Sequence, residues 1–403
     1  MDAAHKASYS IRQRSVERAF ESVITGPKFM DRANVVIIGG GVVGCAVARA
    51  LSARWSDVFL LEALPRLALG ASSRNSGVIH AGLYYPPGSL KARHCVRGNV
   101  LTYEFCSAHG VPHRRTGKLV VAASPEETEA LESLRKKAET NGVEGLRIVD
   151  SRRIREREPH AVGCQAIEVL STGIVAAEEL TKAYARVAAD QGAHVVLNAR
   201  VERLEPLRDG TRVMSTAGEI ETRCLVNSAG LFADEVAALL GSSMARHRIY
   251  PVRGEYCELA RGKQDWINGL VYPLPHTDGK SLGVHFTKTI WGSVLLGPTA
   301  RYIEDKNNYE RDRYRIEEFV PEARQLVPEI EAADLVLAHS GIRAKLTPPA
   351  NSLSAKGGVA DFIIERDPEY PSVVHLMGIE SPGLTSAPSM AEQVSAMVGE
   401  ILA

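Results

Sequence analysis

The strongest constraint on the fold is a glycine-rich turn that joins a buried strand to a helix. Residues 34–38 form a continuous apolar run, as in parallel strands that are covered on both faces. The sequence GGGVVG then places Gly39, Gly41 and Gly44 at GxGxxG spacing, and an apolar helical pattern follows. The first glycine permits a tight turn, the second lets the backbone approach a pyrophosphate, and the third lets helix and strand pack closely. The segment therefore predicts a dinucleotide site.

A second apolar strand supports this interpretation. Residues 58–61 read VFLL and are followed by Glu62, whose carboxylate can accept hydrogen bonds from ribose hydroxyls and would repel a 2′-phosphate. The alternative is a glycine-rich turn without special function, followed by a surface glutamate. Strand, helix, strand and acid together favour dinucleotide binding, but they do not distinguish NAD from FAD.

Composition excludes several other classes of protein. The 403 residues correspond to two or three domains at roughly 150 residues each. Lys and Arg together number 48, as do Asp and Glu, so the chain lacks the basic excess of a nucleic-acid-binding protein. The six cysteines form no CxxC pair, and no metal site or disulfide framework is expected. No apolar run reaches the roughly 18 residues of a membrane span, so we expect at most peripheral membrane association.

The order of predicted elements indicates two domains that are interleaved along the chain. Residues 249–300 are rich in β-formers between turn glycines and prolines, and α/β segments lie on both sides of them. We expect a mixed α/β protein, α+β overall. Its Rossmann-like domain would be assembled from the discontinuous segments 34–110, 150–243 and 340–403, and its β-rich substrate domain from 111–149 and 244–339.

Local patterns predict the individual elements. Further strands are expected at 118–122, 194–204 and 373–377, and helices at 90–109, 125–141, 178–191, 233–240, 310–328 and 388–402. Residues 71–87 fit neither pattern and form a long polar loop, and long loops in compact domains are often functional.

Residues 1–33 precede the first strand and have a different character. The apolar residues within 16–24 fall at helical spacing, and basic residues are frequent. This pattern is typical of an organelle-targeting presequence, which would make the protein mitochondrial. The acidic residues Asp2, Glu17, Glu21 and Asp31 instead favour an additional surface helix on a cytoplasmic protein.

The loop after the second strand carries a family resemblance. Residues 71–91, ASSRNSGVIHAGLYYPPGSLK, resemble the corresponding segment of FAD-dependent oxidoreductases of the D-amino-acid oxidase and glycerol-3-phosphate dehydrogenase group. In detail they are similar to the L-2-hydroxyglutarate dehydrogenases. The similarity runs from about residue 34 to 395. Further matching segments are GKL at 117–119, TGIV at 172–175, NSAG at 227–230, RGEY at 253–256, YPLP at 272–275, LGVH at 282–285, SGIR at 340–343 and GIESPGLT at 378–385.

The resemblance implies FAD, bound extended across the first domain. Backbone N–H groups at the start of the C-terminal helix would then stabilise the negative charge that the flavin gains on reduction. The positions implied for cofactor contact are Ser72, Ser73 and Asn75 near the pyrophosphate and flavin, Val201 at the adenine, Ala229 and Gly230 beneath the cofactor, and Gly383, Leu384 and Thr385 over the flavin end.

Oxidation of a 2-hydroxy acid requires a hydride acceptor, a base for the hydroxyl proton and a cationic clamp for the carboxylate. Histidine is the natural base because its ordinary pKa lies near working pH. His285 lies in an apolar strand and His80 in the presumed flavin loop, and with the resemblance both are placed in the active site. We favour His285 as the base and His80 as a contact of flavin or substrate, although the alternative assignment stays open.

Arginines provide candidates for the clamp, because a guanidinium binds a carboxylate as a bidentate fork. In the wider group an arginine at the position of Arg343 binds an anionic part of the substrate. Arg253 is a second candidate, and two carboxylates require two positive centres. The alternative for Arg253 is a structural ion pair. Tyr84, Tyr272 and Lys345 complete the predicted substrate contacts.

Three functions are compatible with these features. The first is FAD-dependent oxidation of L-2-hydroxyglutarate to 2-oxoglutarate, with electrons passed to a quinone, an electron-transfer protein or dioxygen. The second is oxidation of another substrate by a related flavoprotein, such as an amino acid, glycerol 3-phosphate or another 2-hydroxy acid. The third is a non-catalytic assembly factor that binds flavin. The VIHAGLYYP stretch favours the first.

Overall fold

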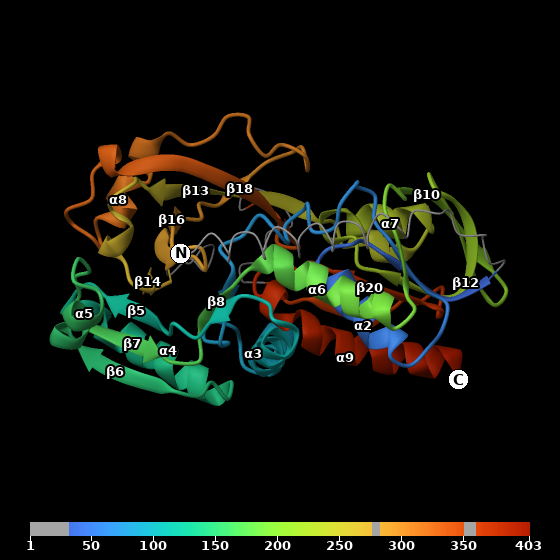
Figure 1. Ribbon diagram of the computed structural model, residues 1–403, viewed down its shortest axis with the longest axis horizontal. Coiled ribbons are helices and arrows are strands. Elements are labelled where there is room, and N and C mark those ends of the chain that lie inside the picture. The colour runs from blue at the N-terminus through green and yellow to red at the C-terminus, as the bar shows by residue number, and fades with distance from the viewer. Residues whose placement is uncertain (1–31, 276–282, 350–359) are drawn as a thin grey trace, which may run out of the picture.

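The computed structural model describes residues 32–275, 283–349 and 360–403, and within them two large sheets lie side by side along the long axis (Figure 1). Helices cover both sheets. The first sheet has the strand order β10-β11-β12-β1-β2-β9, with β20 paired to β12 and β19 paired to β20. Its strands are β1 (Arg32–Ile38), β2 (Val58–Leu61), β9 (His194–Val196), β10 (Val201–Leu207), β11 (Gly210–Ser215), β12 (Gly218–Asn227), β19 (Ile363–Arg366) and β20 (Val373–Met377).

The centre of this sheet is parallel because the apolar strands are buried on both faces. β1 pairs in parallel with β2 and β12, and β12 pairs in parallel with β20. Four helices pack against one face around a core that includes Val35, Leu60 and Val226. They are α2 (Val42–Ser52), α3 (Leu90–His109), α6 (Ala177–Asp190) and α9 (Gly383–Leu402). The short helix α7 (Ala233–Leu239) contacts β10, β12 and β20.

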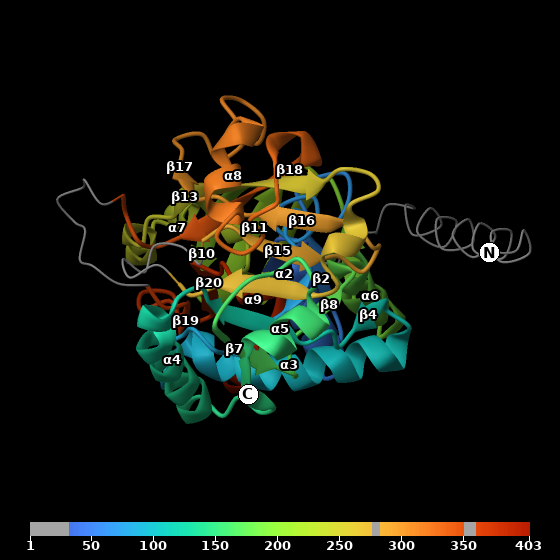
Figure 2. The ribbon, with the colours of Figure 1, turned by 90° about the vertical axis from the view of Figure 1, so that its left-hand side faces the viewer.

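The second sheet has the order β17-β13-β16-β15-β14-β5-β7-β6, and β18 also pairs with β13. In both views α8 and β18 lie at one end of this region and α4 and α5 at the other (Figure 2). Its strands are β5 (Lys118–Ala122), β6 (Leu146–Asp150), β7 (Gln165–Val169), β13 (Tyr250–Leu259), β14 (Leu270–Pro273), β15 (His285–Lys288), β16 (Val294–Gly297), β17 (Arg301–Tyr302) and β18 (Leu335–Lys345). Its helices are α4 (Thr128–Thr140), α5 (Ser151–Arg157) and α8 (Val320–Ala323).

The described residues also form a small third sheet. It has the order β3-β8-β4, and its central strand is antiparallel to both neighbours. Its strands are β3 (Val78–Ile79), β4 (His113–Arg114) and β8 (Gly173–Val175). The sheets and helices together confirm the mixed α/β class that the sequence predicts.

The sheet memberships differ in detail from the predicted domain boundaries. Residues 165–169 belong to the second sheet, although 150–243 was assigned to the first domain, because β7 pairs with both β5 and β6. Strand β18 likewise crosses the predicted boundary at 340 while staying paired with β13. The predicted strand at 194–204 is two strands, β9 and β10, which pair with different partners.

The prediction of a helix over 310–328 is wrong. That stretch contains only a short 3-10 turn at Ile316–Glu318 and the single turn of α8. Its charged side chains bond to neighbouring strands instead of following a helix face: Arg313, for example, donates to the Ala338 carbonyl and pairs with Glu255. The N-terminal prediction for 1–33 lies almost entirely outside the described residues.

Candidate active site

One large cavity, of about 1560 Å³, lies where the two sheets meet. It is lined from the first sheet by residues such as Gly39 and Glu62, and from the second by residues such as His285 and Arg343. This volume exceeds the roughly 300–1000 Å³ typical of a pocket for one small ligand. The cavity therefore has room for an extended dinucleotide together with a small substrate.

The glycine turn has the geometry that its sequence predicts. Gly39 has a φ of +108°, and a Cβ there would lie 2.6 Å from the Ser228 carbonyl oxygen. Gly41 is the N-cap of α2 and lines the cavity, so the start of the helix faces the space. Gly44 does not line the cavity: a Cβ there would lie 1.9 Å from the Gly39 carbonyl oxygen, so this glycine allows α2 to pack on the turn.

Glu62 is held beside the same turn by backbone hydrogen bonds. Its two carboxylate oxygens accept hydrogen bonds from the backbone N–H groups of Gly40, at 2.6 Å, and Leu64, at 2.8 Å. Burial raises the pKa of Glu62 and outweighs the opposite effect of these donors and of Arg200. The carboxylate is thereby fixed at the wall of the cavity, and each oxygen keeps a lone pair for a further donor.

The loop at 71–77 is held by its own polar side chains. Ser72 accepts a hydrogen bond from the backbone N–H of Val42 at the start of α2, at 2.8 Å. Asn75 donates to the carbonyls of Ala71 and Ser72 and accepts from the N–H of Gly77. Ser72 and Asn75 line the cavity, but the structure does not bring Ser73 to it.

The remaining predicted cofactor contacts, with one exception, also line the cavity. They are Val201, Ala229, Gly230, Gly383 and Leu384. Thr385 is fully buried behind them, where it accepts a hydrogen bond from the backbone N–H of His80 at 2.9 Å. Thr385 therefore ties the start of α9 to the histidine loop and does not reach the cavity.

Both predicted histidines line the cavity, and both are neutral. Burial, reinforced by nearby cations, lowers the pKa of His80 and that of His285 to about 3. The Nδ1 of His285 lies 2.9 Å from the Gly283 carbonyl oxygen, which can only accept, so Nδ1 carries the proton and Nε2 is left as an acceptor. The His285 ring stacks on Tyr272 with 3.7 Å between ring centroids.

His80 is held less tightly. Its Nε2 lies 3.4 Å from the Ser381 hydroxyl, and its buried Nδ1 has no hydrogen-bond partner among the described residues. An unsatisfied buried nitrogen is unfavourable unless a ligand completes it.

A cluster of charges lines one part of the cavity wall. Arg343 and Lys345 stand two residues apart on β18, so both face the same side of the strand, and both line the cavity. Glu380 lies 3.6 Å from Lys345 and 3.0 Å from the buried Lys91. Burial alone would raise the pKa of Glu380, but Lys91 and Lys345 hold it below its ordinary value. The cluster contains three cations and one anion, which suits an anionic ligand.

Comparison with known proteins identifies the family. The model of the family described as FAD dependent oxidoreductase matches residues 34–397. The chain belongs to the FAD-dependent oxidoreductases. It is 34% identical to a Caenorhabditis elegans protein named mitochondrial L-2-hydroxyglutarate dehydrogenase (92% of this chain, 95% of the relative). It is 36% identical to an Arabidopsis thaliana protein of that name (91% and 83%) and 31% to an Escherichia coli L-2-hydroxyglutarate dehydrogenase (91% and 93%).

Solved structures of FAD-dependent oxidoreductases share the fold. The chain superposes on an FAD-bound L-α-glycerophosphate oxidase from Mycoplasma pneumoniae with a TM-score of 0.81, at 25% identity (92% of this chain, 95% of that chain). A glycine oxidase from Geobacillus kaustophilus gives a TM-score of 0.75 at 21% identity, over 92% and 95%. As a member of this family the protein is an FAD-dependent enzyme.

The residues present fit FAD. The open start of α2 suits a pyrophosphate, the fixed Glu62 suits a ribose, and the start of α9 opens into the cavity through Gly383 and Leu384. Among the described residues, no group of three or more His, Cys, Asp or Glu side chains has the arrangement of a metal site. No helix in the described ranges is long and apolar enough to cross a membrane.

Gly44 offers a test of this cofactor site. The substitution Gly44→Ala places a methyl group against the Gly39 carbonyl and is expected to push α2 away from the turn. Overpacking of this kind lowers the free energy of unfolding by about 1–3 kcal/mol or more. Purified protein should then carry much less FAD per chain by absorbance. The control is Gly399→Ala near the end of α9, where the closest atom is the flexible tip of Arg54 at 3.2 Å. Equal FAD content in both variants would contradict the packing argument.

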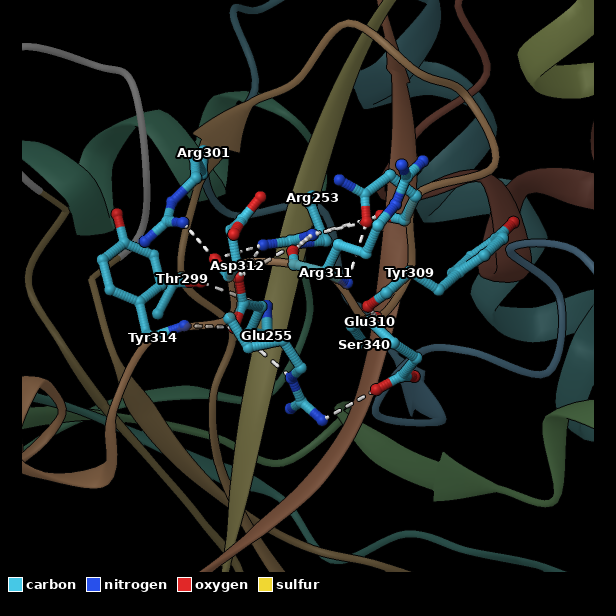
Figure 3. Close-up of polar contacts among 12 residues, drawn as sticks. Arg253, Glu255, Thr299, Arg301, Tyr309, Glu310, Arg311, Asp312, Tyr314 and Ser340 are labelled. Carbon is cyan, nitrogen blue, oxygen red and sulfur yellow. Dashed lines mark hydrogen bonds and ion pairs between the residues drawn. The ribbon is translucent and has the colours of Figure 1, made fainter.

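The structure corrects the prediction for Arg253. This side chain is fully buried and does not line the cavity, whereas its neighbour Gly254 does. Successive residues of a strand point to opposite faces, so Arg253 faces away from the site. Figure 3 shows the guanidinium beside Glu255, at 2.9 Å, and bonded to carbonyls of the 308–312 loop. Arg253 therefore forms the structural ion pair that was the alternative, and it fixes a loop whose Asn307 and Tyr309 line the cavity.

Arg253→Met should accordingly affect folding first. Removing one partner of a buried ion pair costs about 3–5 kcal/mol, so the midpoint of urea unfolding is expected to fall clearly. A substrate clamp would behave differently, because its Met variant would fold normally and lose substrate affinity. Normal unfolding with a strongly raised KM would therefore overturn this assignment.

Three residues of the site were missed by sequence reasoning. Lys91 and Glu380 stand inside motifs that carry the resemblance, but their pairing joins positions far apart in the chain. Lys118 begins the apolar strand KLVVA, and a single charged residue in such a strand was the sequence signal that could have found it. In the structure its side chain is fully buried beside Tyr84. Tyr84 and Tyr272 line the cavity as predicted contacts.

Proposed function

We propose that this enzyme oxidises L-2-hydroxyglutarate to 2-oxoglutarate and passes the electrons to a quinone or another acceptor. The observation that carries the proposal is the meeting of a neutral histidine of fixed tautomer with a cationic cluster in one cavity. The names of the relatives, which match over most of the chain, support the same substrate.

The histidines would handle the hydroxyl proton. FAD, when bound, supplies the hydride acceptor at flavin N5. His285 is the base in this proposal because the Gly283 carbonyl holds the proton on Nδ1 and leaves Nε2 as the acceptor; its pKa of about 3 makes it a weaker base than an exposed histidine. His80 is a contact of substrate or flavin, and its orphaned Nδ1 would gain a partner from the bound molecule.

Arg343 and Lys345 would bind carboxylate. The Arg343 guanidinium is oriented by donation to the Thr299 carbonyl at 3.0 Å, and a Cβ at Gly254 would lie only 3.1 Å from its Nη2, so the glycine leaves room for it. Glu380 orients Lys345 and Lys91 without cancelling the positive excess of the cluster. A dicarboxylate would supply the missing negative charge.

The second candidate is a related reaction on an amino acid, glycerol 3-phosphate or another 2-hydroxy acid. The solved neighbours named as glycerophosphate oxidase and glycine oxidase favour keeping it. The cationic cluster favours a doubly charged anion over glycine. The assembly-factor hypothesis is set aside, because the family is enzymatic.

A substrate panel tests the proposal. The FAD-loaded enzyme is assayed with an artificial electron acceptor on L- and D-2-hydroxyglutarate, L-lactate, glycerol 3-phosphate and glycine. We expect kcat/KM to be highest for L-2-hydroxyglutarate. A higher value for glycerol 3-phosphate or glycine would overturn the substrate assignment and support the second candidate.

We also propose a mitochondrial location for the protein and a quinone as its electron acceptor. The eukaryotic relatives named as mitochondrial support a mitochondrial protein with residues 1–33 as presequence, and the Escherichia coli relative, whose name gives no compartment, keeps the cytoplasmic alternative open. Fractionation of cells that express the full chain decides between them. The quinone is tested by adding a soluble quinone analogue to the assay in place of the artificial acceptor.

A further inference from the structure

Lys118 is a buried cation that the proposed reaction has not used. It is 0% exposed on β5, and no carboxylate of the described residues pairs with it. Its Nζ donates to the Tyr84 hydroxyl at 3.1 Å and lies 4.6 Å from the ring centroids of both Tyr84 and Tyr272. A buried ammonium without a counter-charge is unfavourable, so Lys118 either gives up its proton or requires an anion from outside the protein.

The nearest source of an anion is the cavity itself. Tyr84 is only half-buried and forms part of the cavity wall, with Lys118 behind it. Because the Tyr84 oxygen accepts from Lys118, its own hydrogen is free to be donated to a ligand, and the charge behind it strengthens that donation. Tyr272, between Lys118 and His285, completes the same wall.

We propose that Lys118 is the second positive centre of the substrate site, that it acts through the Tyr84 hydroxyl on one carboxylate of the ligand, and that it takes up a proton when that ligand binds. This role rests on the proposed function, since it requires a dicarboxylate. It replaces the role predicted for Arg253, while Arg343 and Lys345 serve the other carboxylate. Lys118 is a positioning residue, because it acts on the ligand through Tyr84.

The groups around Lys118 make the proton linkage specific. Burial lowers the pKa of Lys118 to about 7, and an anion beside it would raise that pKa again. The titratable groups that face it are Tyr84, Tyr272, His80, His285 and Cys95. The histidine pKa values lie near 3, and burial raises those of the tyrosines and Cys95 well above the ordinary range. Only Lys118 therefore titrates between pH 6 and 9 in this group.

The sign of the effect follows from these values. At pH 6 Lys118 already carries its proton, so ligand binding takes up none. At pH 8 most of the free enzyme has neutral Lys118, so binding takes up nearly one proton, and ligand affinity is expected to weaken roughly 50- to 100-fold between pH 6 and 9.

The test measures binding of 2-oxoglutarate to the oxidised, FAD-loaded enzyme by isothermal titration calorimetry, at pH 6 and pH 8, in buffers of different ionisation enthalpy. The wild type should take up nearly one proton at pH 8 and almost none at pH 6. Lys118→Met should take up none at either pH and bind roughly 10- to 100-fold more weakly at pH 6. Lys182→Met, an exposed lysine on α6 that pairs with Glu178, is the matched control and should behave as wild type.

Three results would each overturn a stated part of the proposal or all of it. Binding by the wild type without proton uptake at pH 8 rejects the linkage alone. Unchanged ligand affinity in Lys118→Met rejects Lys118 as a positive centre. If that variant loses its FAD, Tyr84→Phe takes its place: we expect about tenfold weaker binding, and unchanged affinity rejects the positive centre equally. Failure of the wild type to bind 2-oxoglutarate at any pH overturns both this proposal and the proposed function.

Discussion

Replacing Arg343 with alanine is expected to lower kcat/KM for L-2-hydroxyglutarate about 100-fold, mainly through a higher KM. The guanidinium lines the cavity and donates to the Thr299 carbonyl, so it would meet a substrate carboxylate in a fixed orientation. A charge-assisted hydrogen bond to an ionised group is worth roughly 1.5–3 kcal/mol, and each 1.4 kcal/mol corresponds to a factor of ten. Steady-state kinetics with an artificial acceptor measures the change.

Two further variants serve as comparisons for Arg343→Ala. Arg343→Lys keeps the charge but loses the fork, and it should fall between wild type and Arg343→Ala. Arg203→Ala removes an exposed arginine that pairs with Glu205 on the surface, and it should leave KM unchanged. An unchanged KM in folded, FAD-loaded Arg343→Ala would remove Arg343 from the substrate site.

Replacing His285 with asparagine is expected to reduce kcat by a factor of about 10² to 10⁴, the usual contribution of a general base. Asparagine keeps a hydrogen-bonding group near the Gly283 carbonyl but offers no basic nitrogen. FAD content and thermal unfolding should stay close to wild type, because among the described residues Tyr272 is the one ring that stacks on His285, and His285 lines the cavity. Rapid-mixing measurement of flavin reduction isolates this step from reoxidation.

His80→Asn separates the two histidines. If His285 is the base, His80→Asn should retain more activity than His285→Asn, and its loss should appear partly as weaker binding of FAD or substrate. The reverse order, with the larger loss of flavin reduction in His80→Asn, would transfer the base to His80.

Much of the fold could be predicted from the sequence, because the strongest sequence signals for helices, strands and turns are local. The strand at 58–61, the helix at 90–109 and the strand at 373–377 match β2, α3 and β20 residue for residue. The glycines also worked as predictors, since a positive φ at Gly39 and a 1.9 Å approach at Gly44 leave no choice of side chain. These features depend on the backbone within a few residues.

The site was harder to predict than the fold, because its residues come together through strand pairings that no local sequence pattern specifies. Whether Arg253 or Gly254 faces the cavity depends on which face of β13 is turned toward it, and a shift of one residue exchanges the two. Residues 310–328 have helical composition, yet Arg313 finds better partners in Glu255 and the Ala338 carbonyl than a helix would offer. The contact between Lys118 and Tyr84 joins residues that lie 34 positions apart in the chain.

The visible spectrum of the purified enzyme under anaerobic conditions is the most direct test of FAD-dependent oxidation of L-2-hydroxyglutarate. We expect a flavin spectrum that bleaches when L-2-hydroxyglutarate is added and stays unchanged with the D isomer. A flavin spectrum that L-2-hydroxyglutarate leaves unchanged, while glycerol 3-phosphate or an amino acid bleaches it, would contradict the proposed substrate.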